Sequence, residues 1–263
     1  MDGSTPSEHA RRRVAVVGAG AAGTMAAIFA ARGGADVLLL EPTAEGGRKI
    51  LISGGGRCNI LPARLDESRF VTDSSAHTLR KIVRAWPLSE QIDFFDRELG
   101  LALVEETETG KLFPASNRAR DVRDGLIALA TREGARFRGN TGVRGVLPLE
   151  EGRWRVVLED ESSLDVDAVI VASGGLSVPK TGSDGVGLQI ARKLGHTIHK
   201  TYPALTPLLA EPSAYTELAG VSLRVTLTAQ SAARWARSVH NPVETPAATS
   251  PSPPPAEYAH ADS

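Results

Sequence analysis

A glycine-rich turn near the start of the chain lies between an apolar strand pattern and an alanine-rich helix pattern. The β-branched run at residues 14–17 leads into Gly-Ala-Gly-Ala-Ala-Gly, and helical residues continue to Arg32 before two glycines stop the pattern. A second apolar run at residues 36–41 follows directly and is typical of a parallel strand covered on both faces. This order predicts a βαβ unit with the fingerprint of a dinucleotide-binding fold.

Each position of the glycine-rich turn has its own physical task. Gly18 permits the tight turn, Gly20 lets the backbone approach a pyrophosphate, and Gly23 lets the helix lie close to the sheet. The helix N-terminus directs free N–H groups at the phosphates, and the carboxylate of Glu41 accepts hydrogen bonds from the ribose. An ordinary α/β unit with a glycine turn is the alternative, which the complete motif disfavours. The predicted binding residues of this unit are Gly18, Ala19, Gly20, Ala21, Ala22, Gly23 and Glu41.

Residues 42–63 are predicted to form a long loop, with glycines in two clusters. Loops of this length inside a compact domain are usually functional. Its glycine backbone and its cationic side chains can wrap a pyrophosphate and reach a flavin ring, so the loop favours FAD over a simple NAD domain. The alternative is that these cations are solvated loop charges. The predicted binding residues of the loop are Gly47, Arg48, Lys49, Ser53, Gly54, Gly55, Arg57, Cys58 and Asn59.

The middle of the chain carries helical and strand patterns in turn. Apolar residues recur at helical spacing over residues 77–99 with a break at a proline, which predicts a pair of helices. Residues 101–113 alternate weakly and predict a hairpin. Ser116 or Asn117 is expected to cap the helix that follows.

Strand patterns dominate the next part of the chain. Strands are predicted at residues 135–138 and 143–147, a polar-faced β-excursion at 154–166, a buried strand at 168–172 and a helix at 185–194. With the βαβ unit, these elements predict an α/β fold. It consists of a Rossmann-type FAD-binding domain with a β-excursion, and the chain ends in a disordered tail. The start of a second substrate domain between them is implied by the family resemblance given below.

The expected domain boundaries follow from the change in composition along the chain. Residues 1–12 are polar and aperiodic, and residues 241–263 are rich in Pro, Ala and Ser, so we expect both segments to be disordered. Residues 13–205 are expected to form the FAD-binding domain. The family resemblance given at the end of this section implies that residues 206–240 are a partial start of an inserted substrate domain.

Charge and cysteine content narrow the function classes. The chain has 30 basic and 31 acidic residues, so no overall field draws it to nucleic acid or to an anionic membrane. Its single cysteine, Cys58, excludes an internal disulfide framework and a paired-cysteine redox centre, and it fits a reducing cytoplasm. Three arginines at residues 11–13 precede an uncharged run at residues 14–31, an arrangement that resembles a signal sequence. The glycines at positions 18, 20 and 23 of this run instead favour a strand, a turn and a helix. We therefore expect a cytoplasmic protein without a membrane span.

Six strings of the sequence carry a family resemblance: GAGAAG, VLLLE, GGRKILISGGGRCN, KLFPASNRARDV, VIVASGG and LSVPKTGSDGVGLQIARKLGH. They resemble the bacterial BaiN-like, or aminoacetone-oxidase-like, NAD(P)/FAD-dependent oxidoreductases over residues 13–225. The resemblance implies FAD held by the residues named above, by the backbone of Val143 beside the adenine, and by the strand end at Ala172, Ser173 and Gly174. It also implies that hydride passes from NAD(P)H through FAD to an unsaturated substrate, either a steroid-like small molecule or a uridine in RNA.

The chain departs from this family in two respects. Family members continue much further, through an inserted substrate domain and a last segment that returns to the FAD domain, whereas here the pattern fades after Leu223. We therefore expect a C-terminally truncated member, with a non-catalytic dinucleotide-binding remnant as the alternative and an NAD-only dehydrogenase as a disfavoured third. Serine also stands at position 173, where threonine is more usual, and keeps the hydroxyl.

No catalytic residue is assigned, because the cofactor itself carries flavin chemistry. Cys58 is a candidate redox residue, although a buried free cysteine is more often structural. Two histidines near residue 196 lack a third ligand, so no metal site is expected. Arg118, Arg120 and Arg123 can meet a phosphate-bearing substrate, but a solvated helix face is the favoured interpretation. The oligomeric state and the choice between NADH and NADPH stay open.

Overall fold

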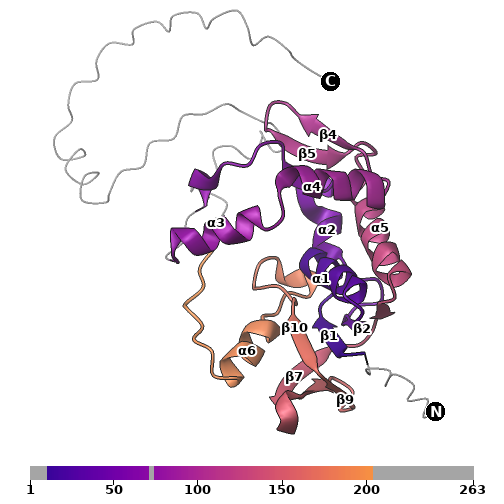
Figure 1. The fold of residues 1–263 in the computed structure, drawn as a ribbon, viewed down its shortest axis with the longest axis vertical. Helices are drawn as coiled ribbons and strands as arrows, with labels where there is room; N and C mark the ends of the chain where they lie inside the picture. Colours follow the sequence, from indigo (N-terminus) through magenta and orange to yellow (C-terminus); the bar gives the residue numbers. More distant parts are fainter. Residues whose placement is uncertain (1–10, 71–73, 204–263) are drawn as a thin grey trace, which may run out of the picture. The chain divides into compact units, whose positions relative to one another are not determined.

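The computed structural model describes residues 11–70 and 74–203, which belong to one unit of the chain, residues 1–204. Its centre is a parallel four-stranded sheet in the order β10-β1-β2-β6 (Figure 1). The strands are β1 (Arg13–Val17), β2 (Asp36–Leu40), β6 (Arg136–Arg138) and β10 (Ala168–Val171). β1 pairs with β2 on one side and with β10 on the other, so Val14 lies beside both Val37 and Ala168. The predicted Rossmann-type α/β fold is confirmed.

The side chains of the central strands alternate between two cores. In β1, Val14 and Val16 belong to the core under the helices, whereas Ala15 and Val17 belong to the core under a small antiparallel sheet. Because both faces are covered, β1 and β2 are apolar almost throughout. The covering elements are α1 (Ala21–Arg32) and α5 (Ala119–Arg132) on one face, and β7 (Val143–Pro148), β8 (Trp154–Leu158) and β9 (Ser163–Val166) on the other. The predicted β-excursion is thus confirmed, with β7 as its third strand.

Two glycines set the distance between the start of α1 and the sheet. A Cβ atom at Gly23 would overlap the carbonyl oxygen of Gly18 and would lie 3.3 Å from the Cβ of Ala172. Gly18 itself has a φ of 100°, a conformation that residues with a side chain rarely adopt. The helix therefore begins directly at the strand ends, which is the arrangement that the glycine-rich turn predicts.

Residues 42–63 contain short helical turns that the loop prediction missed. α2 (Arg48–Ile52) and η1 (Ser53–Gly56) lie between the two glycine clusters. A five-residue helix is too short to give a periodic pattern that a sequence reading can detect. The chain then enters a second antiparallel sheet, in the order β3-β5-β4, formed by β3 (Leu61–Pro62), β4 (Leu103–Glu106) and β5 (Lys111–Pro114). The predicted hairpin is its β4–β5 part.

The predicted helical pair is present and packs on α1 through aromatic side chains. Its elements are α3 (Ala76–Arg84) and α4 (Leu88–Asp93), which continues into the π-helical turn η3 (Phe94–Glu98). The short 3-10 turn η2 (Glu67–Arg69) precedes the pair. The rings of Trp86 and Phe94 meet edge to face with centroids 5.5 Å apart, and Phe29 of α1 contacts both rings. Such contacts contribute about 0.5–1.5 kcal/mol each beyond the area they bury.

Two local predictions were wrong. α5 follows Arg118, and no side chain caps it; Asn117 instead occupies a turn with a φ of 52°, so neither it nor Ser116 is the cap. β10 was expected to be buried, but Ile170 and Val171 are 36% and 44% exposed. An apolar run indicates a strand without indicating whether the strand lies at the centre or at the edge of a sheet. The other elements of this part are η4 (Glu150–Gly152), η5 (Pro179–Thr181) and α6 (Val186–Lys193).

Within the described ranges, no helix combines the length and the apolar character that a bilayer crossing requires. The uncharged run that imitates a signal sequence forms β1 and α1. The expected segments 206–240 and 241–263 lie outside the described residues, as do residues 1–10 of the expected N-terminal tail. The proposed domain boundaries therefore stay predictions.

The close packing at Gly23 predicts a steric effect of one methyl group. Gly23→Ala should lower the free energy of unfolding by about 1–3 kcal/mol, because α1 must move away from the Gly18 carbonyl. Gly20→Ala is the matched control in the same turn: its Cβ would meet nothing within 4 Å, and we expect a loss of about 1 kcal/mol or less. Denaturant unfolding followed by circular dichroism measures both values, and a Gly23→Ala variant as stable as the parent would contradict the packing.

Candidate functional site

A cavity of about 540 Å³ lies at the carboxyl ends of the parallel strands. Its wall includes Val17 at the end of β1, Leu40 at the end of β2, and Ala172 directly after β10. The volume falls in the range of about 300–1,000 Å³ that is usual for small-molecule sites. Ligands of open α/β sheets bind in the crevice at this edge, where the connections leave the strands.

The start of α1 presents backbone donors to the cavity. The helix begins at Ala21 with Gly20 as its N-cap residue, and no side chain caps it. First-turn N–H groups have no partner within their own helix, and the helix dipole favours negative charge at this end. Gly20, Ala21 and Ala22 all line the cavity, and the space beside the Cα of Gly20 is open. This end of the helix therefore suits a phosphate group.

Glu41 lies at the end of β2 and is held as an acceptor in the cavity wall. The residue is only 8% exposed. Its Oε2 accepts a hydrogen bond of 2.9 Å from the Ala19 N–H, and its Oε1 accepts one of 2.6 Å from the Thr43 hydroxyl. A carboxylate has about four acceptor positions, so capacity remains for a ribose hydroxyl.

The turn after Glu41 is joined to the glycine-rich turn by backbone hydrogen bonds. The Gly47 N–H donates to the Ala19 carbonyl at 3.0 Å, and the Gly46 N–H donates to the Thr43 hydroxyl oxygen at 3.1 Å. Together with the bonds of Glu41, these form a closed network around Ala19. The network fixes the start of α2 at the cavity wall.

Two cations at the start of α2 bring positive charge to that wall. Arg48 is exposed, whereas Lys49 is half-buried with its Nζ 3.2 Å from the Ser177 hydroxyl. Lys49 has no ion pair with an acid of the described part of the chain, so its charge is available to an anion. Charge-assisted hydrogen bonds of this kind are roughly twice as strong as neutral ones.

The segment directly after β10 places a serine hydroxyl, that of Ser173, at the cavity wall. The Ser173 Oγ is buried and has no hydrogen-bond partner among the described residues. A Cβ at Gly187 would overlap this hydroxyl, so α6 packs closely against it. Gly174 follows with a φ of 82°, and a Cβ there would lie 3.2 Å from the Ser183 Oγ and 3.5 Å from the Lys49 Nζ. A buried hydroxyl without a partner costs free energy that a ligand group can restore.

Arg123 of α5 packs against the turn at residues 45–47 and forms hydrogen bonds with it. Its side chain is 4% exposed, and its Nη1 donates to Glu45 Oε2 at 2.9 Å. Burial opposes the positive charge, but the pairs with Glu45 and Asp124 outweigh it, so the pKa of Arg123 lies above its ordinary value. The solvated-face interpretation is therefore wrong for this residue, while Arg118 and Arg120 are exposed as expected.

Gly47 is required at this contact for two reasons. A Cβ would overlap the Arg123 Cγ, and the residue has a φ of 65°. Gly47 is also the residue that precedes α2 and bonds to Ala19. Arg123 is thus a positioning residue for the turn, and it does not itself line the cavity.

Most of the residues predicted to bind the cofactor share one cavity. Fifteen of the twenty line it: Gly18, Gly20, Ala21, Ala22, Glu41, Gly47, Arg48, Lys49, Ser53, Cys58, Asn59, Val143, Ala172, Ser173 and Gly174. The cavity wall does not include Ala19, Gly23, Gly54, Gly55 or Arg57. Ala19 and Gly23 lie one layer behind it, in the contacts described above. The cofactor contacts of all twenty residues stay predictions.

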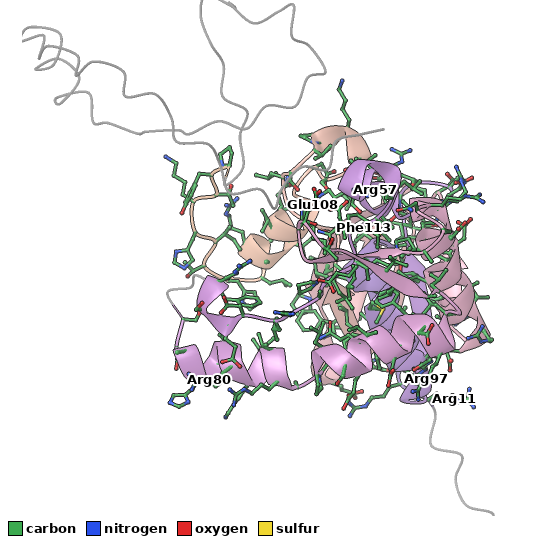
Figure 2. All side chains as sticks on the ribbon, turned by 90° about the horizontal axis from the view of Figure 1, so that it is seen from above. Arg11, Arg57, Arg80, Arg97, Glu108 and Phe113 are labelled. Carbon is green, nitrogen blue, oxygen red and sulfur yellow. The ribbon has the colours of Figure 1, made fainter. Side chains whose placement is uncertain are left out.

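Arg57 is engaged elsewhere. Its guanidinium lies 4.1 Å from the centroid of the Phe113 ring, and its Nη1 is 2.9 Å from Glu106 Oε1. Figure 2 shows Arg57 and Phe113 next to each other at the hairpin. The positive charge of Arg57, which the sequence predicted to bind a pyrophosphate, is thus paired with the β4–β5 hairpin instead.

Several cavity residues were not found from the sequence. Phe95, Val122 and Leu126 come from η3 and α5, while Gly142 and Glu159 come from the antiparallel excursion. Their presence depends on how distant elements pack, and no local pattern marks them. Ser183 is different, because it lies in the long string that carries the family resemblance.

Cys58 lines the cavity as a buried thiol. The residue is 6% exposed and has a φ of 66°, and its N–H donates to the Ser53 carbonyl at 3.0 Å. Burial raises the pKa of the Cys58 thiol, although a side-chain hydrogen bond with Ser53 acts in the opposite direction. A thiol with a raised pKa is protonated at neutral pH and is a poor nucleophile.

The model of one protein family matches most of the chain. This family is described as HI0933-like protein Rossmann domain, and the match covers residues 12–240. It therefore includes every element that lines the cavity.

Curated relatives match about four fifths of the chain. A 3-dehydro-bile acid delta(4,6)-reductase of Clostridium scindens is 33% identical over 211 residues, which are 80% of this chain and 50% of the relative. Ribosomal RNA dihydrouridine synthases of Escherichia coli and Haemophilus influenzae are 29% and 30% identical over 218 residues, or 82% and 81% of this chain and 53% of each relative. The chain spans about half the length of these relatives.

The buried position of Arg123 predicts a large effect of its removal. Arg123→Met should lower the free energy of unfolding by about 1–3 kcal/mol, because the Gly46 and Gly47 turn loses its support and a hydrogen-bonded charge. Arg120→Met on the exposed face of the same helix is the control and should change stability by about 0.5 kcal/mol or less. An equal loss of unfolding free energy in the two variants, measured by denaturant unfolding, would show that Arg123 does not stabilise the turn.

The raised pKa of Cys58 predicts slow alkylation. Because this is the only cysteine, mass spectrometry after iodoacetamide treatment reports on it alone. In the folded protein the rate should stay low at pH 8 and rise only above the ordinary pKa of a thiol, since a raised pKa leaves less thiolate at any given pH. The same chain in urea should react at the rate of a free cysteine, and an equally fast reaction of the folded protein near pH 7 would contradict the assignment.

Proposed function

The chain belongs to the family of the HI0933-like protein Rossmann domain, and from this we propose that it binds FAD at the strand ends and acts as an FAD-dependent oxidoreductase. One observation carries the proposal. The glycine-rich turn, the acid at the end of β2, the start of α2 and the strand end after β10 all line a single cavity. A simple nucleotide fold needs only the first two of these.

The residues present fit an extended dinucleotide. At one end, Glu41 offers a carboxylate to the ribose and the start of α1 offers N–H groups to the pyrophosphate. At the other end, the buried Ser173 hydroxyl, which has no hydrogen-bond partner in the described part of the chain, offers a donor to a polar ring or its side chain. The Lys49 ammonium offers a positive charge there. The second end favours FAD over a nicotinamide dinucleotide, because the segment that follows β2 forms part of the wall instead of another βα unit.

The protein's contribution to the reaction is binding, orientation and electrostatics. FAD, when bound, supplies the capacity to accept and donate hydride. Glu41 holds the adenosine half, Lys49 and Arg48 balance negative charge, and the apolar residues of the wall limit the access of water. Cys58 is protonated and contributes shape and a weak donor.

For the reaction partners, we propose NAD(P)H as the hydride donor and an unsaturated substrate as the acceptor. The relatives' names support a reductive reaction, in one case on a bile acid and in the other on ribosomal RNA.

A second candidate function is dinucleotide binding without turnover. The exposure of Gly174 favours it, because this residue lines the cavity directly after Ser173 and water can reach the cavity there. A flavin ring open to water lacks the dry surroundings that its chemistry exploits. In this case the ADP half still binds, because its contacts come from β1, α1 and β2.

Titration calorimetry and absorbance spectroscopy distinguish these functions. An FAD-dependent oxidoreductase should bind FAD at one equivalent per chain, turn yellow and oxidise NAD(P)H in the presence of an electron acceptor. Dinucleotide binding without turnover should give equal affinity for FAD and ADP and no NAD(P)H oxidation. Binding of neither FAD nor ADP would overturn the proposal altogether.

The position of Glu41 predicts a loss of affinity on substitution. Glu41→Ala should weaken the binding of FAD and of ADP by about 1–3 kcal/mol, because the ribose hydroxyls lose a charged acceptor. Glu150→Ala, an exposed acid on η4 that does not line the cavity, is the control and should bind as the parent does. Circular dichroism establishes that the variants fold, and unchanged affinity of a folded Glu41→Ala protein would remove Glu41 from the site.

A further inference from the structure

Glu159, the residue after β8, lies against a glycine at the cavity wall. Its N–H donates to the Gly142 carbonyl at 2.9 Å. Its carboxylate lies where a Cβ at position 142 would be, so that any side chain there would overlap both carboxylate oxygens. Glu159 and Gly142 both line the cavity, and the glycine makes room for the acid.

The carboxylate of Glu159 has no partner among the described residues, in contrast to the acids that follow it. Asp160 accepts a hydrogen bond from the Ser162 hydroxyl at 2.6 Å, and Glu161 lies 3.5 Å from the guanidinium of Arg144. The side chain of Glu159 is exposed, and none of the other described residues forms a hydrogen bond or an ion pair with it. All of its acceptor positions are therefore free to meet a donor in the cavity.

The position of Glu159 in the cavity is set by the end of β2. The Thr141 N–H donates to the Glu41 carbonyl at 2.8 Å, which fixes the segment before β7 beside the ribose acid. Gly142 continues that segment, and Glu159 is bonded to Gly142. The free carboxylate thus lies on the Glu41 side of the cavity, where Val143 also lines the wall.

We propose that Glu159 recognises the base of the bound nucleotide by accepting a hydrogen bond from the exocyclic amine of adenine. This inference rests on the proposed function, which puts the adenosine half beside Glu41. An ionised carboxylate can only accept hydrogen bonds. Adenine presents an amine donor at position 6, whereas hypoxanthine presents a carbonyl acceptor there, which the carboxylate repels. Glu159 is then the residue that makes the site selective for adenine.

Titration calorimetry with ADP and IDP tests this, because the two nucleotides differ only in the base. The parent protein should bind ADP more tightly than IDP, by about five- to tenfold. Glu159→Gln should reduce this ratio to about two or less, because an amide can donate to the carbonyl of hypoxanthine as well as accept from adenine. The ratio is unaffected by the loss of one negative charge, since both nucleotides carry the same phosphates.

Glu161→Gln is the matched control, as it removes an acid two residues away that is paired with Arg144. It should leave the ratio of ADP to IDP affinity as in the parent. An unchanged ratio in Glu159→Gln, or an equal loss in both variants, would overturn the role of Glu159 while leaving the nucleotide site intact. Failure of the parent protein to bind ADP would instead overturn the proposed function, and this inference with it.

Discussion

Parallel pairing of β1 with both β2 and β10 brings three strand ends to the same edge of the sheet. The cavity lies at this edge, and its wall includes residues at or directly after all three strand ends. α1 can begin there because Gly18 turns sharply and Gly23 leaves no side chain between helix and sheet. The result is a helix N-terminus, an acid and a buried hydroxyl brought together from residues far apart in the sequence.

The charged groups around this edge have separate tasks. Glu41 and the turn that follows it form a hydrogen-bonded network around Ala19, and Arg123 supports that network from α5. Arg123 is buried and paired with Glu45, so its charge stabilises the turn. Lys49 lines the cavity and has no ion pair among the described residues. This separation leaves a positive charge in the cavity that can meet a pyrophosphate.

The sequence was sufficient to predict those parts of the cavity wall that are formed by local segments. The turn at residues 18–23, the acid at the end of β2 and most of the glycine-rich loop were predicted because their residue types and spacing carry the physical requirement themselves. The burial of Arg123 and the place of Glu159 were not, because each depends on packing between elements that are distant in the chain. α2 was missed because five residues give no helical period, and β10 was misjudged because an apolar run does not distinguish an edge strand from a central one.

We propose that a dinucleotide lies across the three strand ends, and amide hydrogen exchange measured with and without FAD shows whether it does. Slower exchange on addition of FAD is expected in peptides that cover residues 18–24, 46–50 and 172–174, with no change in β9, which does not line the cavity. Protection of the first two segments alone would indicate that only the ADP half binds. Exchange that is unchanged in all three segments, or protection confined to β9, would contradict the claim.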